Sequence, residues 1–342
     1  MNRGATATVG LPTALDLEPA VGSNAELARD LRAIERALAA GIGSNESRIE
    51  AAARQGLLGG GKRLRPLLTC AVLRALGQDP ARYVELVVAV EMAHAGSLLH
   101  DDIIDVSQTR RGRLTGHVAF DVPTAVLAGD RLVMLAVEHL ARGAPAEMLV
   151  RFSTALRDLC VGESLERERR FDANAGLEHA RKVNRLKTAS LFAYAAEAGA
   201  ILAGAPRRVR DAARTYGLSL GEAFQTTDDY LDLCGDGDVM GKSIGQDVTA
   251  GAVSVPVAIA LEHSASLREE VLRVWQARRK DEVRARLERL RDRMDRAGVL
   301  AATLRLAAAD ASRAADAMRA LPPGPWRERM ASFARTIVTR ER

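Results

Sequence analysis

The feature that most constrains the fold of this chain is the spacing of its prolines. The 342 residues include 11 prolines, and none lies between Pro145 and Pro206, between Pro206 and Pro256, or between Pro256 and Pro322. Proline interrupts a helix, and the intervening segments are rich in Ala, Leu, Arg and Glu, which favour helix. Three long segments are therefore predicted to be helical.

The periodicity of apolar residues also indicates helices rather than strands. Apolar side chains recur three or four positions apart among charged residues, as in an amphipathic helix, at Val283, Leu287, Leu290 and Met294. The stretch 81–105 is more apolar, as expected for a buried helix. The chain has 2 Trp, 4 Tyr and 6 Phe, which is few for a strand-rich protein, and no segment alternates like a strand. We predict an all-α fold of about ten or more helices.

No linker clearly divides the chain. Residues 1–22 lack periodicity and are predicted to be a flexible N-terminal arm, and residues 23–342 to be a single all-α domain. Cys70, Cys160 and Cys234 are far apart and form no CxxC pair, which argues against a disulfide framework or a zinc site and fits a reducing cytoplasm. No run of 18 apolar residues occurs, so no transmembrane segment is predicted.

The overall charge excludes little by itself. The formal net charge is +5, and the sequence pI is near 9.4. Basic residues are interleaved with nearly as many acids, which is typical of a mixed solvated surface. Aromatic platforms for stacking on bases are also scarce, so no nucleic-acid partner is predicted.

A group of three aspartates in an apolar segment is the first chemical signal. In Leu98–Asp105, Asp101 and Asp105 are four positions apart and would project from one helix face, with Asp102 about 100° further round. Unpaired carboxylates are unfavourable in apolar surroundings. A wet helix end, nearby arginines or a bound metal ion would each compensate them.

The same DDxxD spacing recurs at Asp228, Asp229 and Asp232. Carboxylate oxygens suit Mg²⁺, which commonly takes one or two carboxylates and completes its shell with water and substrate phosphate. Two such clusters in one helical chain would therefore hold a diphosphate through bridging metal ions. Neither an HExxH motif nor an EF-hand loop occurs, so zinc proteolysis and calcium sensing are not predicted.

Short cationic motifs flank both clusters. They are Lys62, Arg63 and Arg65 within Gly61–Pro66, then Arg110 and Arg111, Lys187, and Lys242. Arginine can hold phosphate oxygens bidentately, and lysine acts as a point charge. As a set beside two acidic clusters, these residues predict clamps for two anionic groups.

These motifs, in this order, resemble the trans-isoprenyl diphosphate synthases, or polyprenyl synthetases, from about residue 57 to the C-terminus. The matching segments are Gly61–Pro66, His94, Asp101–Asp105, Arg110–Gly112, Ala128–Asp130, Lys187–Thr188, Phe224–Gln225, Asp228–Asp232, Gly241–Lys242 and Phe333–Val338. The resemblance implies helices around a central cavity, a homodimer, and a Mg²⁺-dependent condensation of isopentenyl diphosphate with an allylic diphosphate. The allylic diphosphate ionises, the isopentenyl double bond attacks the cation, and proton loss leaves an all-trans chain five carbons longer.

The resemblance also implies a role for each matching residue. The metal ligands would be Asp101, Asp102, Asp105, Asp228, Asp229 and Asp232, with three Mg²⁺ ions once substrate is bound. Arg110, Lys187, Gln225 and Lys242 would bind the allylic diphosphate, and Lys62, Arg65, His94 and Arg111 would bind isopentenyl diphosphate. Thr188 would lie beside the carbocation. The catalytic set would be Asp101, Asp102, Lys187, Thr188, Gln225 and Asp228.

Three positions depart from the family pattern. Leu114 stands where a proline is usual, and Glu166 stands where a glutamine is usual. Ala252 replaces a lysine that helps to bind the allylic diphosphate. Allylic binding would be weaker unless another residue supplies the missing cation.

Small residues precede the first aspartate cluster, where bulky aromatics close the cavity in family members that make short products. The positions are Ser97 and Gly96, with Ala93 and Met92 one turn further back. We therefore expect a product of C20 or longer, with Met92 or another helix as a possible floor at C20 or C25.

Two other readings remain open. A class I terpene cyclase shares the fold and the first cluster, but normally has an Asn/Ser/Glu metal motif instead of the second. A non-catalytic subunit of a heteromeric prenyl synthase typically lacks both clusters. Because this chain keeps both, the elongating transferase is favoured.

Overall fold

The structure is a computed structural model that describes residues 25–43, 47–234 and 245–339. The predicted arm at 1–22 lies outside these residues. The chain divides into two compact units, of which unit 1 comprises Met1–Cys70 and Asp79–Ala144, and unit 2 comprises Ala71–Gln78 and Pro145–Arg342. The single domain predicted for residues 23–342 stays a prediction.

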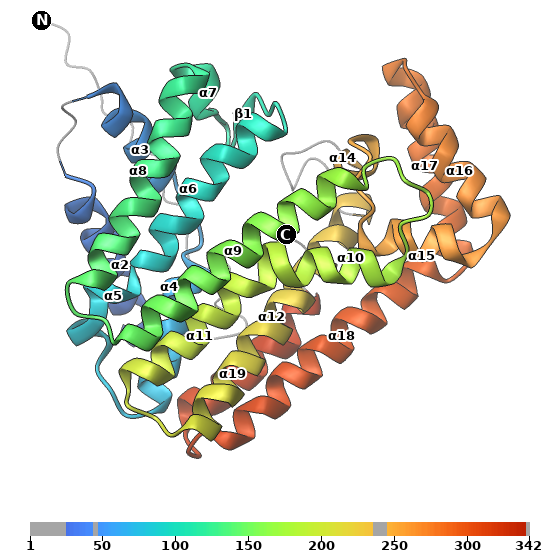
Figure 1. The fold of residues 1–342 in the computed structure, drawn as a ribbon. Helices are drawn as coiled ribbons and strands as arrows, with labels where there is room; N and C mark the ends of the chain where they lie inside the picture. The colour runs from blue at the N-terminus through green and yellow to red at the C-terminus, as the bar shows by residue number, and fades with distance from the viewer. Residues whose placement is uncertain (1–24, 44–46, 235–244, 340–342) are drawn as a thin grey trace, which may run out of the picture. The chain divides into compact units, whose positions relative to one another are not determined.

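The regular elements of unit 1 are helices and one short hairpin, as far as its residues are described. Its elements are α2 (Ala25–Gly41), α3 (Arg48–Leu58), the first part of α4 (Leu64–Ala75), the 3-10 turn η2 (Pro80–Tyr83), α5 (Val84–Val87), α6 (Ala89–Ile104), β1 (Thr109–Arg110), β2 (Arg113–Leu114), α7 (Gly116–Ala119) and α8 (Val122–Ala141) (Figure 1). Helix α6, which carries the first aspartate cluster, packs on α8, and both pack on α3.

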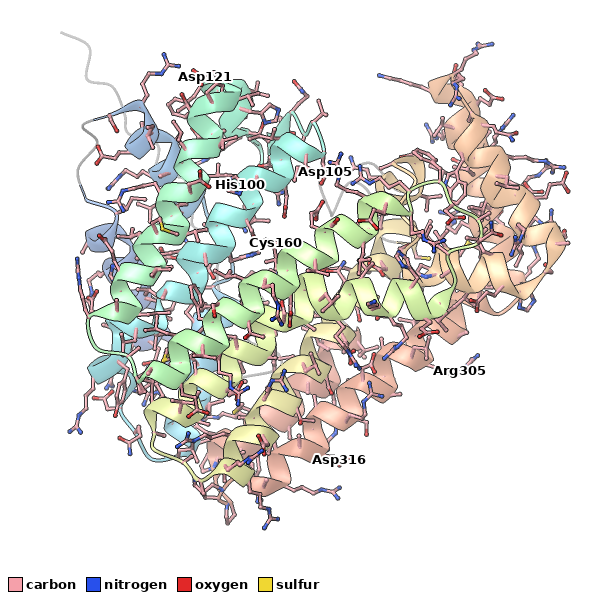
Figure 2. The ribbon with its side chains drawn as sticks, in the orientation of Figure 1. His100, Asp105, Asp121, Cys160, Arg305 and Asp316 are labelled. Atoms are coloured by element: carbon pink, nitrogen blue, oxygen red, sulfur yellow. The ribbon has the colours of Figure 1, made fainter. Side chains whose placement is uncertain are left out.

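Glycines let α6 and α8 approach closely. A Cβ at Gly129 of α8 would lie 2.2 Å from the Nε2 atom of His100, and a Cβ at Gly96 of α6 would lie 2.8 Å from the carbonyl oxygen of Gly129. His100 therefore lies against α8, where its Nε2 atom is 3.1 Å from the carbonyl oxygen of Val126 (Figure 2). This contact determines which face of α6 is turned away from α8.

The β1–β2 hairpin follows the first aspartate cluster. Thr109 pairs with Leu114 and Arg110 with Arg113, in antiparallel register. The two turn residues, Arg111 and Gly112, both have positive φ, at 52° and 73°. Such a turn matches the twist of the two strands. The hairpin places Arg110 and Arg111 beyond the end of α6. The sequence patterns did not predict this short β element.

The described regular elements of unit 2 are α-helices and short helical turns. They are α9 (Ala146–Glu168), α10 (Leu177–Asn184), the π-helical turn η3 (Arg185–Ala189), α11 (Ser190–Leu202), α12 (Arg207–Cys234), α14 (Gln246–Thr249), α15 (Val255–His263), α16 (Ala265–Gln276), α17 (Lys280–Arg296), α18 (Val299–Ala317), η4 (Met318–Ala320), α19 (Pro325–Thr336) and η5 (Ile337–Thr339). Helix α12, which carries the second aspartate cluster, packs on α11 and α18.

Glycines also bring backbones together in unit 2. Residues 190–201 of α11 are all buried. A Cβ at Gly217 would lie 2.2 Å from the carbonyl oxygen of Phe192, and one at Gly221 would lie 2.5 Å from the Cα of Ala189. A substitution at either glycine would therefore separate α11 and η3 from α12. This close packing fixes the position of the Lys187–Thr188 pair relative to the second aspartate cluster.

The predicted all-α class is confirmed. The amphipathic stripe predicted at 283–294 is also confirmed, because Leu287, Leu290 and Met294 are buried on α17 and Val283 packs against the same core. Within the part of the chain that the structure describes, no helix is both long and apolar enough to cross a membrane.

Candidate functional site

In unit 1, a glycine-led loop is anchored by Arg63. Gly60 and Gly61 have φ values of 103° and 145°, and Arg63 has a φ of 49°. The Arg63 guanidinium is buried and forms ion pairs with Glu35, 2.8 Å away, and Glu91, 3.0 Å away. It also donates to the carbonyl oxygen of Leu57. Arg63 therefore acts as a structural anchor, in contrast to its predicted place among the anion clamps.

Anchoring this loop places cations around His94 on α6. Burial lowers the pKa of His94 well below its usual value, and the nearby charges of Arg65, Arg111, Arg110 and Arg63 lower it further. The Arg111 guanidinium lies against Gly61, where a Cβ would come within 2.9 Å of Nη1. Two predicted ligands of isopentenyl diphosphate, Arg65 and Arg111, are thus close enough to a third, His94, for their charges to lower its pKa.

The first aspartate cluster divides into two faces of α6. Asp101 is half-buried and Asp102 is buried, whereas Asp105 is exposed and lies at the end of the helix (Asp105 is labelled in Figure 2). The Nε atom of Arg110 donates to Asp102 across 2.8 Å. Burial raises the pKa of Asp102, and the Arg110 charge opposes that shift. Asp102 therefore already has a cationic partner, and Asp101 and Asp105 lie toward the solvent-accessible side.

The four predicted chain-length residues also lie on different faces of α6. Met92, Ala93 and Gly96 are buried within unit 1. Ser97 is half-buried, on the face that also carries Asp101 one turn further on. Their assignment to chain-length control stays a prediction, and this geometry favours Ser97.

In unit 2, Lys187 lies in the π-helical turn η3. A Cβ at Gly162 of α9 would lie 2.5 Å from the backbone nitrogen of Lys187, so this turn packs directly on α9. The Lys187 ammonium pairs with Glu163, 2.6 Å away, and with Glu166. Although burial opposes it, the two carboxylates raise the pKa of Lys187. π-Helical turns are frequent at functional sites.

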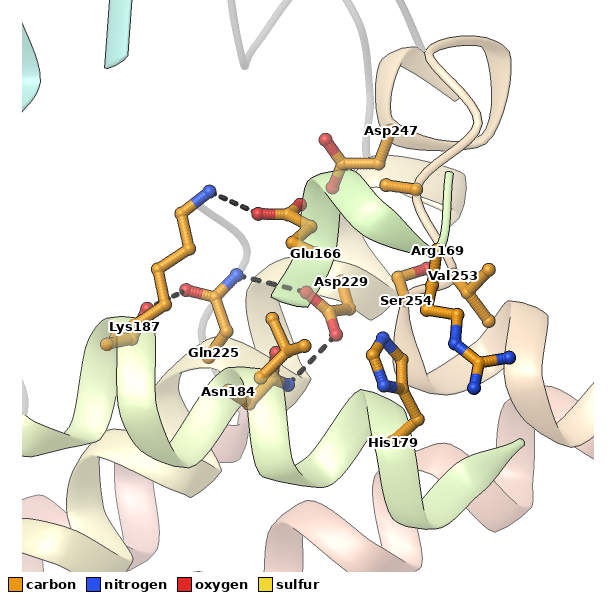
Figure 3. Close-up of a pocket in the computed structure, with 13 residues that line it drawn as sticks. Glu166, Arg169, His179, Asn184, Lys187, Gln225, Asp229, Asp247, Val253 and Ser254 are labelled. Atoms are coloured by element: carbon orange, nitrogen blue, oxygen red, sulfur yellow. Dashed lines mark hydrogen bonds and ion pairs between the residues drawn. The ribbon is translucent and has the colours of Figure 1, made fainter. Parts of the chain in front are cut away.

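A chain of hydrogen bonds joins Thr188 to the second aspartate cluster (Figure 3). Thr188 donates to the Oε1 of Gln225 across 2.8 Å, and the Nε2 of Gln225 donates to Asp229 across 3.0 Å. Asn184 and the backbone N–H of Val255 each donate to the other Asp229 oxygen across 3.1 Å. Burial raises the pKa of Asp229 to about 6, and these hydrogen bonds oppose the shift.

The three aspartates of this cluster therefore differ in their surroundings. Asp229 is buried and accepts three hydrogen bonds, which makes it an organiser of Gln225 and Asn184. Asp228 and Asp232 are half-buried and lie one turn apart on α12. Asp232 also accepts from the backbone N–H groups of Gln246 and Asp247 across 3.2 Å each, at the start of α14.

A cavity of about 130 Å³ opens beside these residues within unit 2. It is lined by Glu166, Arg169, His179, Val183, Asn184, Lys187, Thr188, Gln225, Asp229, Asp247, Ala252, Val253 and Ser254. Two positions that depart from the family pattern, Glu166 and Ala252, thus share this pocket, whereas Leu114 is exposed on the hairpin of unit 1. Predicted Lys242 lies outside the described residues.

Sequence reasoning assigned no role to several lining residues, including Arg169, His179, Asn184 and Asp247. A signal for some of them was present. His179, Val183, Asn184, Lys187 and Thr188 follow the spacing i, i+4, i+5, i+8 and i+9, which places them on one helix face. Arg169 and Asp247 lie on other elements, and only their tertiary positions associate them with the pocket.

The donor chemistry fits a divalent metal whose shell is completed by substrate. Within residues 25–43, 47–234 and 245–339, no group of three or more His, Cys, Asp or Glu side chains forms a ready-made metal site. Mg²⁺ typically binds one or two carboxylates and fills its other positions with water and phosphate oxygens. The half-buried Asp101 with the exposed Asp105, and the half-buried pair Asp228 and Asp232, provide such carboxylates.

Comparisons with known proteins agree with this chemistry. A family model described as "Polyprenyl synthetase" matches residues 46–293. The octaprenyl diphosphate synthase of Escherichia coli is 32% identical over 315 residues, covering 92% of this chain and 97% of that protein. A polyprenyl synthase structure from Caulobacter crescentus, complexed with calcium and isoprenyl diphosphate, is 34% identical with a TM-score of 0.83, covering 96% and 98% of the two chains. A decaprenyl diphosphate synthase structure from Rhodobacter capsulatus is 31% identical with a TM-score of 0.84, covering 96% and 100%.

Proposed function

The chain belongs to the polyprenyl synthetase family and is a trans-polyprenyl diphosphate synthase, and we propose that it condenses isopentenyl diphosphate with an allylic diphosphate to products of C20 or longer. The observation that carries the assignment of residues is the hydrogen-bonded series Thr188, Gln225 and Asp229, which lines one cavity together with the adjacent Lys187. In that cavity an anionic group would meet a lysine, a hydroxyl and an amide at the edge of an aspartate cluster.

We assign the allylic substrate to unit 2. The Lys187 ammonium and the Gln225 amide would bind its diphosphate, and the Thr188 hydroxyl would lie beside the ionising carbon. Mg²⁺, proposed as three ions bound by aspartate carboxylates and the substrate, would supply charge neutralisation for the departing diphosphate. The anchored positions of Asp229 and Gln225 support this assignment, because a preorganised polar site does not need to rearrange during the reaction.

We assign isopentenyl diphosphate to the cationic group of unit 1. Arg65, Arg111 and Lys62 would bind its diphosphate, with His94 among them. The mutual effect of these arginines on His94 supports the assignment, because crowded positive charges are relieved by a bound anion. Arg110 pairs with Asp102 in this structure, and its role in binding the allylic diphosphate stays a prediction.

We also propose that the protein is a homodimer that uses α8 as its contact surface. Four large apolar side chains of this helix are exposed, namely Val122, Val126, Leu127 and Met134. Exposed apolar surface of this kind is typical of an interaction site. The replacement of both Leu127 and Met134 by glutamate should give a monomer in sedimentation velocity. A wild-type protein that is monomeric at micromolar concentration would exclude this contact.

The cytoplasmic location indicated by the cysteines stays a prediction.

The test of function is elongation with defined primers. The protein is incubated with Mg²⁺, labelled isopentenyl diphosphate and dimethylallyl, geranyl, farnesyl or geranylgeranyl diphosphate, and product length is measured. We expect C20 or longer products that disappear with chelator. Absence of elongation with every primer would refute the proposal, and a cyclic hydrocarbon would indicate a terpene cyclase. Elongation that begins only after a second subunit is added would indicate a non-catalytic chain.

Variants of the two clusters test the residue roles. Asp101→Ala and Asp228→Ala should each reduce turnover by several orders of magnitude, because each removes a proposed metal ligand. Asp158→Ala is the matched control, since Asp158 lies on α9 outside the pocket and pairs with the exposed Arg157. Near-normal turnover in both cluster variants would show that the metal assignment is wrong.

A further inference from the structure

The pocket of unit 2 has an uneven distribution of charge. The wall formed by Ala252, Val253 and Ser254 contributes no charged side chain. Lys187 is paired with two carboxylates, Glu163 and Glu166, so its positive charge is largely compensated. Among the described residues that line the cavity, Arg169 is the other permanently charged cation, and it lies near His179 on the side of Val253 and Ser254 (Figure 3).

Arg169 is held in an orientation that leaves donors for another partner. It follows the last residue of α9, and its Nη1 donates to Asp172 across 2.6 Å. Asp172 is itself oriented, because its other oxygen accepts the backbone N–H of Asn174 across 2.9 Å. A guanidinium has five N–H donors. The ion pair with Asp172 therefore positions Arg169 through one of its terminal nitrogens.

Phe171 joins this part of the chain to the segment that contains Ala252, Val253 and Ser254. Its φ is +61°, an unusual conformation for a bulky residue. The Phe171 N–H donates to the carbonyl oxygen of Gly251 across 2.9 Å. Its ring occupies the space next to Gly251, where a Cβ would lie 2.6 Å from ring carbons, and it meets Trp275 edge-on at 5.8 Å. Residues in such conformations persist where their surroundings hold them.

These contacts fix the distance between Arg169 and the uncharged wall. Phe171 is two residues from Arg169, and Gly251 directly precedes Ala252. The hydrogen bond between Phe171 and Gly251 thus joins the segment that contains Arg169 to the segment that contains Ala252. The arginine is consequently held at the pocket by two anchors, Asp172 and Phe171.

We propose that Arg169 is a substrate-binding residue that contacts the diphosphate of the allylic substrate, and that it provides the cation absent from position 252. This inference rests on the proposed function of the pocket. A guanidinium is suited to the task because its planar donors match phosphate oxygens. Arg169 would add a positive charge on the side of the pocket remote from the Lys187 pairs.

The main test compares Arg169→Gln with the wild type in steady-state kinetics. We expect the KM for the allylic diphosphate to rise about 10- to 100-fold, which corresponds to the loss of a hydrogen bond to a charged group. The KM for isopentenyl diphosphate should change by less than about twofold, since Arg169 is not among its proposed ligands. Arg169→Lys should lie between the two proteins. Arg157→Gln is the matched control, because Arg157 is an exposed arginine of α9, the helix that Arg169 directly follows, and it is likewise paired with an aspartate, Asp158.

A second measurement does not depend on turnover. Binding of inorganic diphosphate with Mg²⁺, measured by calorimetry, should weaken by a similar factor in Arg169→Gln. In the double variant Arg169→Gln/Ala252→Lys, a lysine facing the same pocket should restore at least part of the affinity. Circular dichroism and thermal melting confirm that each variant is folded.

The outcomes separate the two proposals. If the wild type elongates and Arg169→Gln retains wild-type values for both the allylic KM and diphosphate affinity, the inference about Arg169 is overturned and the proposed function stands. If the wild type does not elongate any primer, the proposed function fails. Weaker diphosphate binding by Arg169→Gln would then still support Arg169 as an anion ligand of this pocket.

Discussion

Two adjacent small residues on α6 should respond to substitution in different ways. Gly96 and Ser97 both precede the first aspartate cluster and were both predicted to influence product length. A Cβ at Gly96 would lie 2.8 Å from the carbonyl oxygen of Gly129 and 3.1 Å from the Cγ2 of Val133, both on α8. Ser97 is half-buried, and its hydroxyl donates to the carbonyl oxygen of His94 across 2.9 Å. We expect Ser97 to control product length and Gly96 to control stability.

The magnitude for Gly96→Ala follows from two opposing effects. Alanine stabilises a helix interior by about 1 kcal/mol relative to glycine. Overpacking a close contact is unfavourable by about 1–3 kcal/mol, and the contact here is with a backbone oxygen, which cannot rotate away. The free energy of unfolding should therefore fall, by up to about 2 kcal/mol. If Gly96 instead faced open space, the helix effect alone would raise it by about 1 kcal/mol.

For Ser97→Tyr the expected change is in the product. Ser97 lies four residues before Asp101, which is about 6 Å along the helix axis. A tyrosine ring there would lie one turn from the proposed metal ligands on the same face. The growing chain would then meet the ring early, so we expect the main product to shorten toward C15.

Both effects are measured on the same set of proteins. Urea unfolding gives the free energy for Gly96→Ala, with Gly143→Ala as control because no heavy atom lies within 4 Å of a Cβ at that position. The control should be unchanged or slightly more stable. Product length is measured with labelled isopentenyl diphosphate and a geranyl primer. An unchanged product from Ser97→Tyr, or a gain of stability in Gly96→Ala, would refute this account of α6.

Three further predictions follow from the contacts of the site. Glu91→Gln should lower the free energy of unfolding by about 1.5–3 kcal/mol in urea titrations, because buried Arg63 would lose a charged acceptor. Folding lowers the pKa of His94, so as the pH falls the unfolded chain takes up a proton at this residue at a higher pH than the folded protein does. The free energy of unfolding should therefore decrease as the pH drops below about 6.5. Thermal melts of His94→Gln should show a shallower pH dependence, and an identical slope would contradict the assignment. Glu166→Gln should lower the KM for the allylic diphosphate by up to about fivefold, since Lys187 would lose one competing ion pair; a higher KM would show that Glu166 assists binding.

Local patterns predicted much of the site because helical spacing alone determines which side chains share a face. Asp101 and Asp105 on α6, and Asp228 and Asp232 on α12, lie on common faces as their four-residue spacing indicates. The different surroundings of Asp102 and Asp229 were not predictable in this way. The partner of Asp102 comes from a hairpin, and the partners of Asp229 include Asn184 and Val255, which are distant in sequence.

The sequence by itself determined the helical class of this protein, its family and the types of residue that carry its chemistry. These depend on proline spacing, on apolar periodicity and on short motifs, which act over one or two helical turns. Only the tertiary structure decided that Arg63 is a buried anchor, that Gly96 faces α8, and that Arg169 lines the same cavity as Ala252. The physical reason is that burial and pairing depend on side chains contributed by distant segments, and these meet only when the helices pack.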